Sequence, residues 1–113
     1  MDIPEFLPLG SIVVVRGNVK KLLIIARGLA LTQNGEQRYF DYGACMYPEG
    51  LLGDQVIYFN HDVIIKTVFT GYSDDDEALM IESLERTLEH VTIKRGDPAP
   101  FELPDQEKQK EGQ

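Results

Sequence analysis

The residues that could take part in chemistry are few. The chain has one cysteine, Cys45, and two histidines, His61 and His90. A Cys–His dyad needs the imidazole within hydrogen-bonding reach of the sulfur and surroundings that stabilise the thiolate. Cys45 instead lies within the apolar run 42–47, which is typical of a buried, inert thiol. The sequence therefore gives no support for a cysteine nucleophile.

Other catalytic and metal-binding patterns are also weak. Ser11, His61 and Asp62 could be written as a triad, but no Gly-x-Ser-x-Gly elbow surrounds the serine. A turn between two strands explains His61 and Asp62 better. The consecutive acids 74–76 lack the alternating spacing of a calcium loop, and neither glycine-rich phosphate-binding motif occurs. We therefore expect no enzyme activity, no cofactor and no metal site.

The overall charge limits the classes of partner. The 113 residues carry 11 Lys and Arg against 19 Asp and Glu, a formal net charge of -8. This balance disfavours both nucleic acid and anionic lipid as partners. One alternative stays open, a small-barrel nucleic-acid-binding module. It would use a basic cluster together with aromatic side chains that stack on bases: Arg16, Lys20, Lys21, Arg27, Arg38, Tyr39, Phe40 and Tyr42.

The start of the chain gives an expectation about its compartment. It lacks the basic and apolar regions of a signal peptide. The most apolar run, 22–26, is far shorter than the ~20 residues of a membrane span. We expect a cytoplasmic protein without membrane contact.

Strands dominate the first two thirds of the chain. β-branched and aromatic runs predict strands at 12–16, 19–26 with a continuation through 29–32, 37–47, 55–59 and 63–69. Gly17-Asn18 and Asn34-Gly35 both predict two-residue hairpin turns. Gly28 and Gly43 predict bends. Five short, bent strands favour an SH3-like barrel that nearly closes on itself, with an open five-stranded antiparallel sheet as the alternative.

The hydrophobic period then changes to that of a helix. Apolar residues recur at three- and four-residue intervals from Ile81 to Val91, which predicts an amphipathic helix over about 75–94. Asp74 as N-cap and Glu77 resemble a capping box, and Gly96 can end the helix. The predicted architecture is α+β: one domain over 1–95, followed by a proline-containing, mobile polar tail over 96–113.

The negative charge is unevenly distributed. Residues 1–38 carry a net +2, residues 39–93 carry -9 and the remainder carries -1. Most of the acidic excess therefore lies on strands three to five and on the helix. A solvated helix face accounts for it, and the alternative is a surface that attracts a basic partner.

Several stretches resemble a domain family of unknown function from Gram-positive bacteria, encoded beside type VII secretion toxins of the Leu-x-Gly (LXG) class. The resemblance covers about residues 7–77, and its most distinctive elements are Tyr-Pro-Glu-Gly at 47–50 and Phe-Asn-His-Asp at 59–62. Shorter stretches are Leu-Pro-Leu-Gly-Ser at 7–11, Val-Arg-Gly at 15–17, Leu-Ile-Ile-Ala-Arg-Gly at 23–28, Tyr-Phe-Asp-Tyr at 39–42 and Phe-Thr-Gly-Tyr at 69–72. The resemblance implies a small accessory protein that binds one cognate LXG toxin and acts as a chaperone or targeting factor for its export. An immunity protein that binds the toxin's active domain is the runner-up.

We predict a surface of nine residues that contacts the toxin. It combines aromatic and turn residues with the outer face of the helix, since tyrosine is a common interface anchor: Tyr42, Tyr47, Pro48, Glu49, His61, Tyr72, Glu82, Glu85 and Glu89. A plain tight turn accounts equally well for residues 47–50. The fifth strand could also accept a partner strand if it forms a sheet edge. The sequence leaves the oligomeric state open.

Overall fold

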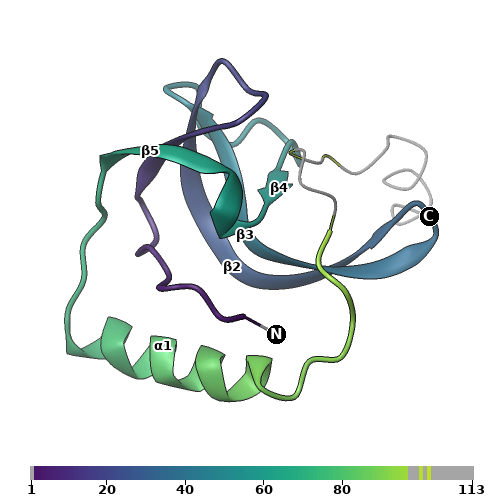
Figure 1. Ribbon diagram of the computed structural model, residues 1–113. Coiled ribbons are helices and arrows are strands. Elements are labelled where there is room, and N and C mark those ends of the chain that lie inside the picture. Colours follow the sequence, from purple (N-terminus) through teal and green to yellow (C-terminus); the bar gives the residue numbers. More distant parts are fainter. Residues whose placement is uncertain (1, 97–99, 101, 103–113) are drawn as a thin grey trace.

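A computed structural model describes residues 2–96, 100 and 102 of the chain (Figure 1). It confirms the α+β class, with five antiparallel strands followed by one helix. A 3-10 turn at His61–Val63 precedes the last strand. The elements are β1 (Ile12–Val15), β2 (Lys21–Gln33), β3 (Glu36–Tyr47), β4 (Ile57–Phe59), β5 (Ile64–Phe69) and α1 (Asp75–Leu88).

The sheet is open. Its strand order is β4-β3-β2-β1-β5, so β4 and β5 form its two edges. The pairing within the described residues joins β5 to β1 but not to β4. The expected closed barrel is therefore wrong, and the open five-stranded sheet is what forms. The long strands β2 and β3 bend strongly, which gives the sheet its curled shape (Figure 1).

The two predicted hairpin turns differ in outcome. Asn34 and Gly35 both have positive φ, 53° and 81°, as a type I′ turn requires, and they join β2 directly to β3. The turn at Gly17-Asn18 is wrong, because β1 ends at residue 15 and β2 begins only at residue 21. The Asn18 side chain accepts a hydrogen bond from the amide of Lys20 (3.1 Å), an Asx-type turn that lengthens the connection.

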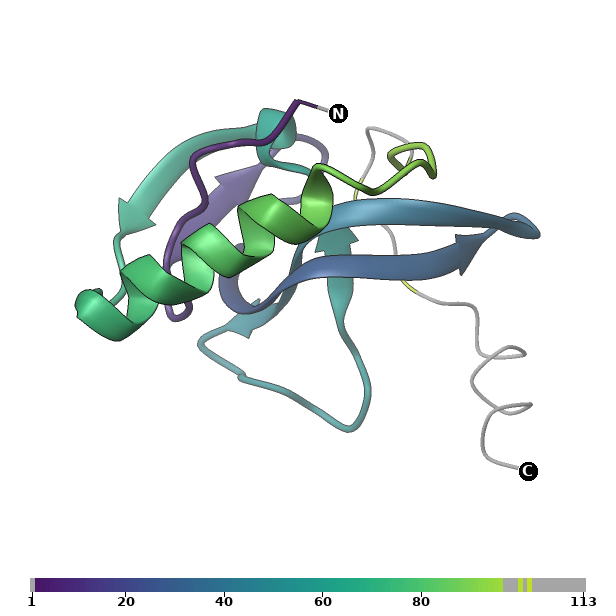
Figure 2. The same ribbon diagram turned by 90° about the horizontal axis from the view of Figure 1, so that it is seen from below.

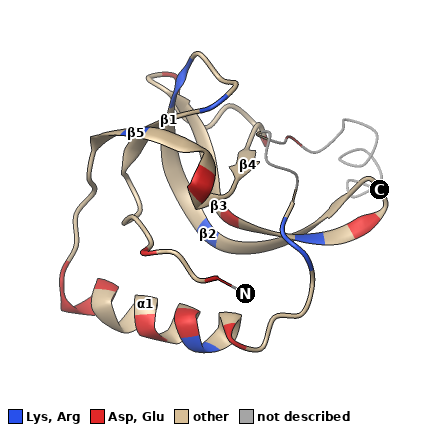
Figure 3. Cartoon of the chain, viewed as in Figure 1, with Lys and Arg blue, Asp and Glu red and all other residues tan. Residues whose placement is uncertain are grey.

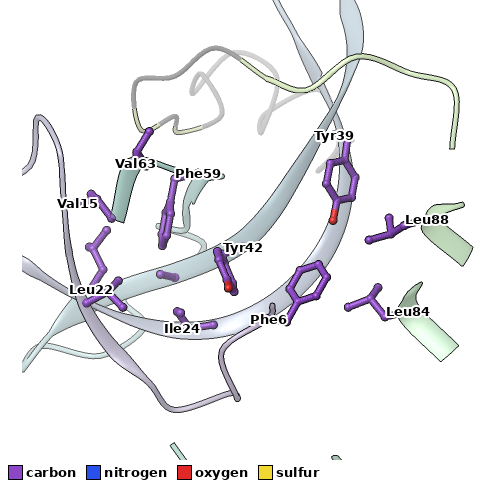
Figure 4. Packing of buried hydrophobic residues seen from close by; sticks show 12 residues of the cluster. Phe6, Val15, Leu22, Ile24, Tyr39, Tyr42, Phe59, Val63, Leu84 and Leu88 are labelled. Carbon is purple, nitrogen blue, oxygen red and sulfur yellow. The ribbon is translucent and has the colours of Figure 1, made fainter. Parts of the chain in front are cut away.

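The core lies between the curled sheet, the helix and the N-terminal segment. Figure 4 shows Phe6 between Tyr42 of the sheet and Leu84 of the helix. The Phe6 and Tyr42 rings meet edge to face, with centroids 5.8 Å apart. Gly28 on β2 lies against the helix, and a Cβ there would come within 2.5 Å of the Leu84 Cδ1 atom. The bare backbone at Gly28 therefore lets the helix approach the sheet closely.

The helix begins as predicted but ends early. The side chain of Asp74 accepts a hydrogen bond from the Glu77 amide (3.1 Å), which confirms the N-cap. The helix ends at Leu88 instead of about residue 94. Lys94 and Gly96 instead pair with Tyr39 of β3, through two backbone hydrogen bonds of 2.9 Å. This long-range pairing outweighs the helical pattern of the sequence.

The predicted tail, 96–113, lies outside the described residues except for Gly96, Pro100 and Glu102. Gly96 packs on the ring of Phe40, where a Cβ would clash. It therefore belongs to the folded part of the chain.

Candidate protein-interaction surface

A polar cluster around Asp41 of β3 holds residues from two of the stretches that carry the family resemblance, 39–42 and 59–62. Asp41 of β3 is almost fully buried, and its Oδ2 atom accepts hydrogen bonds from the His61 amide (2.8 Å) and from Arg95 Nη1 (2.7 Å). Asn60 accepts from the Asp41 amide (2.9 Å) and from Arg95 Nη1 (3.1 Å). The cluster ties the 3-10 turn and the segment after the helix to β3.

Tyr42 belongs to the core and not to the surface. It has no exposed area, so the prediction that Tyr42 contacts a partner is wrong. Its hydroxyl accepts a hydrogen bond from the Leu7 amide (3.0 Å) and lies 2.7 Å from His61 Nδ1. Burial raises the pKa of Tyr42 to about 12. His61 is held by this contact and is only partly accessible.

The aromatic side chains that the nucleic-acid alternative requires are not accessible to bases. Tyr39, Phe40 and Tyr42 are all buried, so none can stack on a base. Burial raises the pKa of Tyr39 as well. Arg27, one of the basic residues in that hypothesis, is engaged in an ion pair with Glu77 and is almost inaccessible.

The residues considered for catalysis serve different parts of the fold. Ser11 is buried, and its Oγ atom accepts a hydrogen bond from the Gly71 amide (2.9 Å). His61 is engaged with Tyr42 and Asp41, and Cys45 is a buried free thiol. Among the described residues, no three His, Cys, Asp or Glu side chains are grouped so that they could hold a metal ion. Within the same residues, no helix has the length and apolarity to cross a membrane.

The turn at Tyr47, Pro48 and Glu49 is exposed and lies at one end of the β2–β3 pair. The peptide bond between Tyr47 and Pro48 is cis. Glu49 forms an ion pair with Lys20 (2.8 Å), and this hydrogen bond lowers the pKa of its carboxyl. Lys21 lies over the Tyr47 ring, 6.0 Å from its centroid. These contacts hold the turn against the start of β2, away from the middle of that strand, where Gly28 meets the helix.

The outer face of α1 carries most of the remaining predicted contact residues. Glu82, Glu85 and Glu89 are exposed and follow one another along one side of the helix. Figure 3 marks the acidic residues in red along this helix and at its start. Tyr72 precedes the helix and is 80% exposed. The structure thus separates the predicted set into the turn at 47–49, the half-buried His61, and a surface at Tyr72 and α1.

A further exposed surface lies on β5, the strand expected to accept a partner strand if it forms a sheet edge. Strand β5 is exposed from Ile65 to Phe69, although most of these residues are apolar or β-branched. Ile65 is 64% exposed, Val68 43% and Phe69 57%. A groove of about 660 Å³ runs between β5 and the N-terminal residues 5–8, and Figure 2 shows these two segments beside each other above the helix. The β-branched run predicts the strand, but only the strand order reveals that it is an edge.

The fold and this surface define a small α+β domain with an open sheet edge. The chain belongs to the DUF4176 family, described as a domain of unknown function, whose model matches residues 6–80. The match includes all five strands and the first part of the helix. Neither the curated proteins nor the solved structures include a significant match to the chain.

Proposed function

We propose that this chain is a non-enzymatic accessory protein that binds one cognate LXG toxin and acts as a chaperone or targeting factor for its type VII export. The observation that carries the protein-binding part is the exposure of Ile65, Val68 and Phe69 on a strand at the sheet edge. Exposed apolar side chains on an edge strand mark a protein-binding site or an aggregation hazard. A dedicated partner would cover them.

The resemblance of residues 7–77 to domains encoded beside LXG toxins supports the identity of the partner. Two of its stretches have clear structural tasks in this chain. Asn60 and His61 form hydrogen bonds with Asp41 that hold the 3-10 turn against β3. Glu49 forms an ion pair with Lys20, the residue before β2. These stretches therefore support the scaffold that presents β5, which is what a shared fold with a variable partner requires.

An immunity protein is the second candidate, and one observation favours it. The acidic outer face of α1, with Glu82, Glu85 and Glu89, could cover a basic active site in the toxin. The two candidates differ in the toxin domain that they bind. A chaperone or targeting factor binds the export domain, whereas an inhibitor binds the active domain.

Co-purification with separated halves of the toxin tests the proposal. The full chain is expressed with the N-terminal export half or the C-terminal active half of an LXG toxin. We expect a stable complex with the N-terminal half. A complex with the C-terminal half alone would instead favour the immunity protein, and binding to neither half would overturn both candidates.

A further inference from the structure

We infer that the groove between β5 and residues 5–8 receives an extended segment of the toxin, which adds to the sheet as a new strand beside β5. This inference rests on the proposed function and names the site and the form of the bound segment. The pairing of β5, the walls of the groove and the charged residues that line it support this inference.

β5 has one free edge. Among the described residues, β5 pairs on one side only, with β1. Its other side leaves backbone amide and carbonyl groups available, which is the requirement for strand addition. The opposite edge of the sheet, β4, has only three residues, and its Phe59 is buried. Short edge strands resist pairing, so β5 is the better acceptor.

The groove is lined by the N-terminal segment and by β5. One wall is formed by Phe6, Leu7 and Pro8, and the other by residues 64–67 of β5. Phe6 is fixed by its contact with Tyr42, and Leu7 by its hydrogen bond to the Tyr42 hydroxyl. The wall opposite β5 is therefore anchored to the core. The six residues of β5 can pair with a segment of similar length, about 20 Å when extended.

The side chains indicate the chemistry of the bound segment. Ile65, Val68 and Phe69 offer apolar area on the two faces of the strand, which favours apolar residues in the partner strand. Glu5 and Asp62 both line the groove, against one positive side chain, Lys66. The fitting segment is therefore apolar and β-branched, with a basic residue that meets Glu5 or Asp62. A second copy of this chain fits less well, because each copy carries a net charge of -8.

Amide hydrogen exchange of the full chain, with and without the toxin, tests the inference. We expect those amides of residues 64–69 that face away from β1 to exchange at least about tenfold more slowly in the complex, because new inter-strand hydrogen bonds protect them. The β2–β3 hairpin tip at residues 33–36 serves as internal control and should not change. A complex with no protection in β5 would overturn the assigned site while leaving the proposed function intact. The absence of any complex would overturn the proposed function and the site together.

A second measurement separates strand addition from side-chain contact. The toxin segment that becomes protected in the same experiment is synthesised as a peptide, with and without N-methyl groups on alternate amides. N-methylation of the amides that face β5 should weaken binding by about tenfold or more, because each methyl group removes a backbone donor. Equal affinity of both peptides would overturn the inference. Protection of β5 in the free chain that disappears as a homodimer dissociates would also overturn it, in favour of a second copy.

Discussion

Arg27 of β2 and Glu77 of α1 form a two-pronged ion pair that is almost completely withdrawn from solvent. Arg27 Nη2 lies 2.8 Å from Glu77 Oε1, and Arg27 Nη1 bonds to the second carboxylate oxygen. The side chains are only 4% and 15% exposed. Arg27 Nη1 also donates to the Leu7 carbonyl oxygen (3.2 Å). One guanidinium thus joins the sheet, the helix and the N-terminal segment that forms a wall of the groove.

Removing one partner of this pair should be costly. We expect Glu77→Ala to lower the free energy of unfolding by about 3–5 kcal/mol, because it leaves the Arg27 charge buried and unpaired. The double variant Arg27→Met with Glu77→Leu should lose clearly less, since no charge remains without a partner. Urea unfolding of the three proteins measures the difference. A double variant as unstable as Glu77→Ala would contradict this expectation.

The Tyr42 hydroxyl should contribute measurably to stability. Tyr42→Phe keeps the ring in the core but leaves the Leu7 amide and His61 Nδ1 without this partner. We expect a loss of about 1–3 kcal/mol, the cost of buried polar groups left unsatisfied. Tyr72→Phe is the matched control, because Tyr72 is 80% exposed and should show no change in thermal unfolding. Equal effects of the two substitutions would be the unfavourable outcome.

The same residue predicts a pH dependence at alkaline pH. Burial raises the pKa of Tyr42 from 10.0 to about 12, so the folded state holds its proton more tightly than the unfolded state. Stability from this group is therefore complete below pH 10.0 and falls between pH 10.0 and about 12, by about 1.4 kcal/mol per pH unit. Unfolding of the wild type and of Tyr42→Phe across this range isolates the effect. The variant should lose less stability than the wild type, and parallel curves would argue against it.

Gly28 should tolerate no side chain. Its φ is +65°, and a Cβ would meet Leu84 Cδ1 at 2.5 Å, so Gly28→Ala combines backbone strain with a clash against the helix. Gly35→Ala is the matched control, with φ +81° and nothing within 4 Å of a Cβ. We expect the control to cost about 1–2 kcal/mol and Gly28→Ala to cost clearly more. Denaturant midpoints compare the two variants. Similar losses of stability would contradict the prediction, because they would mean that the helix shifts at little cost.

The acidic face of α1 should act on the rate of association. Reversing Glu82, Glu85 and Glu89 to lysine should slow binding of the toxin by about tenfold or more at low salt and leave the dissociation rate nearly unchanged. The difference should shrink as salt screens the charges. Surface plasmon resonance at two salt concentrations measures both rates. A change confined to dissociation would instead place these side chains in the bound interface.

Local signals in the sequence predicted local structure well. Asn34-Gly35 and the Asp74 cap depend on a few neighbouring residues, and both form as predicted. The helix end was missed because Lys94 and Gly96 find partners on Tyr39, far away in the chain. Phe6 was also missed, since the segment around it has no periodicity and is ordered only by its contacts with the core.

The candidate binding surface was only partly readable for a related reason. β-branched residues predict β5 as a strand, but its place at the edge follows from its pairing with β1, about fifty residues earlier. The sequence allows Tyr42 to lie at the surface or in the core, because an aromatic side chain on a strand can face either way. The acidic helix face was visible in the sequence, since helical spacing alone puts Glu82, Glu85 and Glu89 on one side.

One titration tests directly whether β5 forms the surface that binds the toxin. Ile65→Lys places a charge on the exposed edge strand, and Val19→Lys places the same charge on a fully exposed position of the β1–β2 connection. Both variants should unfold like the wild type, because both side chains lie at the surface. Isothermal titration with the LXG toxin should show affinity at least about tenfold weaker for Ile65→Lys and unchanged for Val19→Lys. Equal affinity of both variants and the wild type would contradict the account.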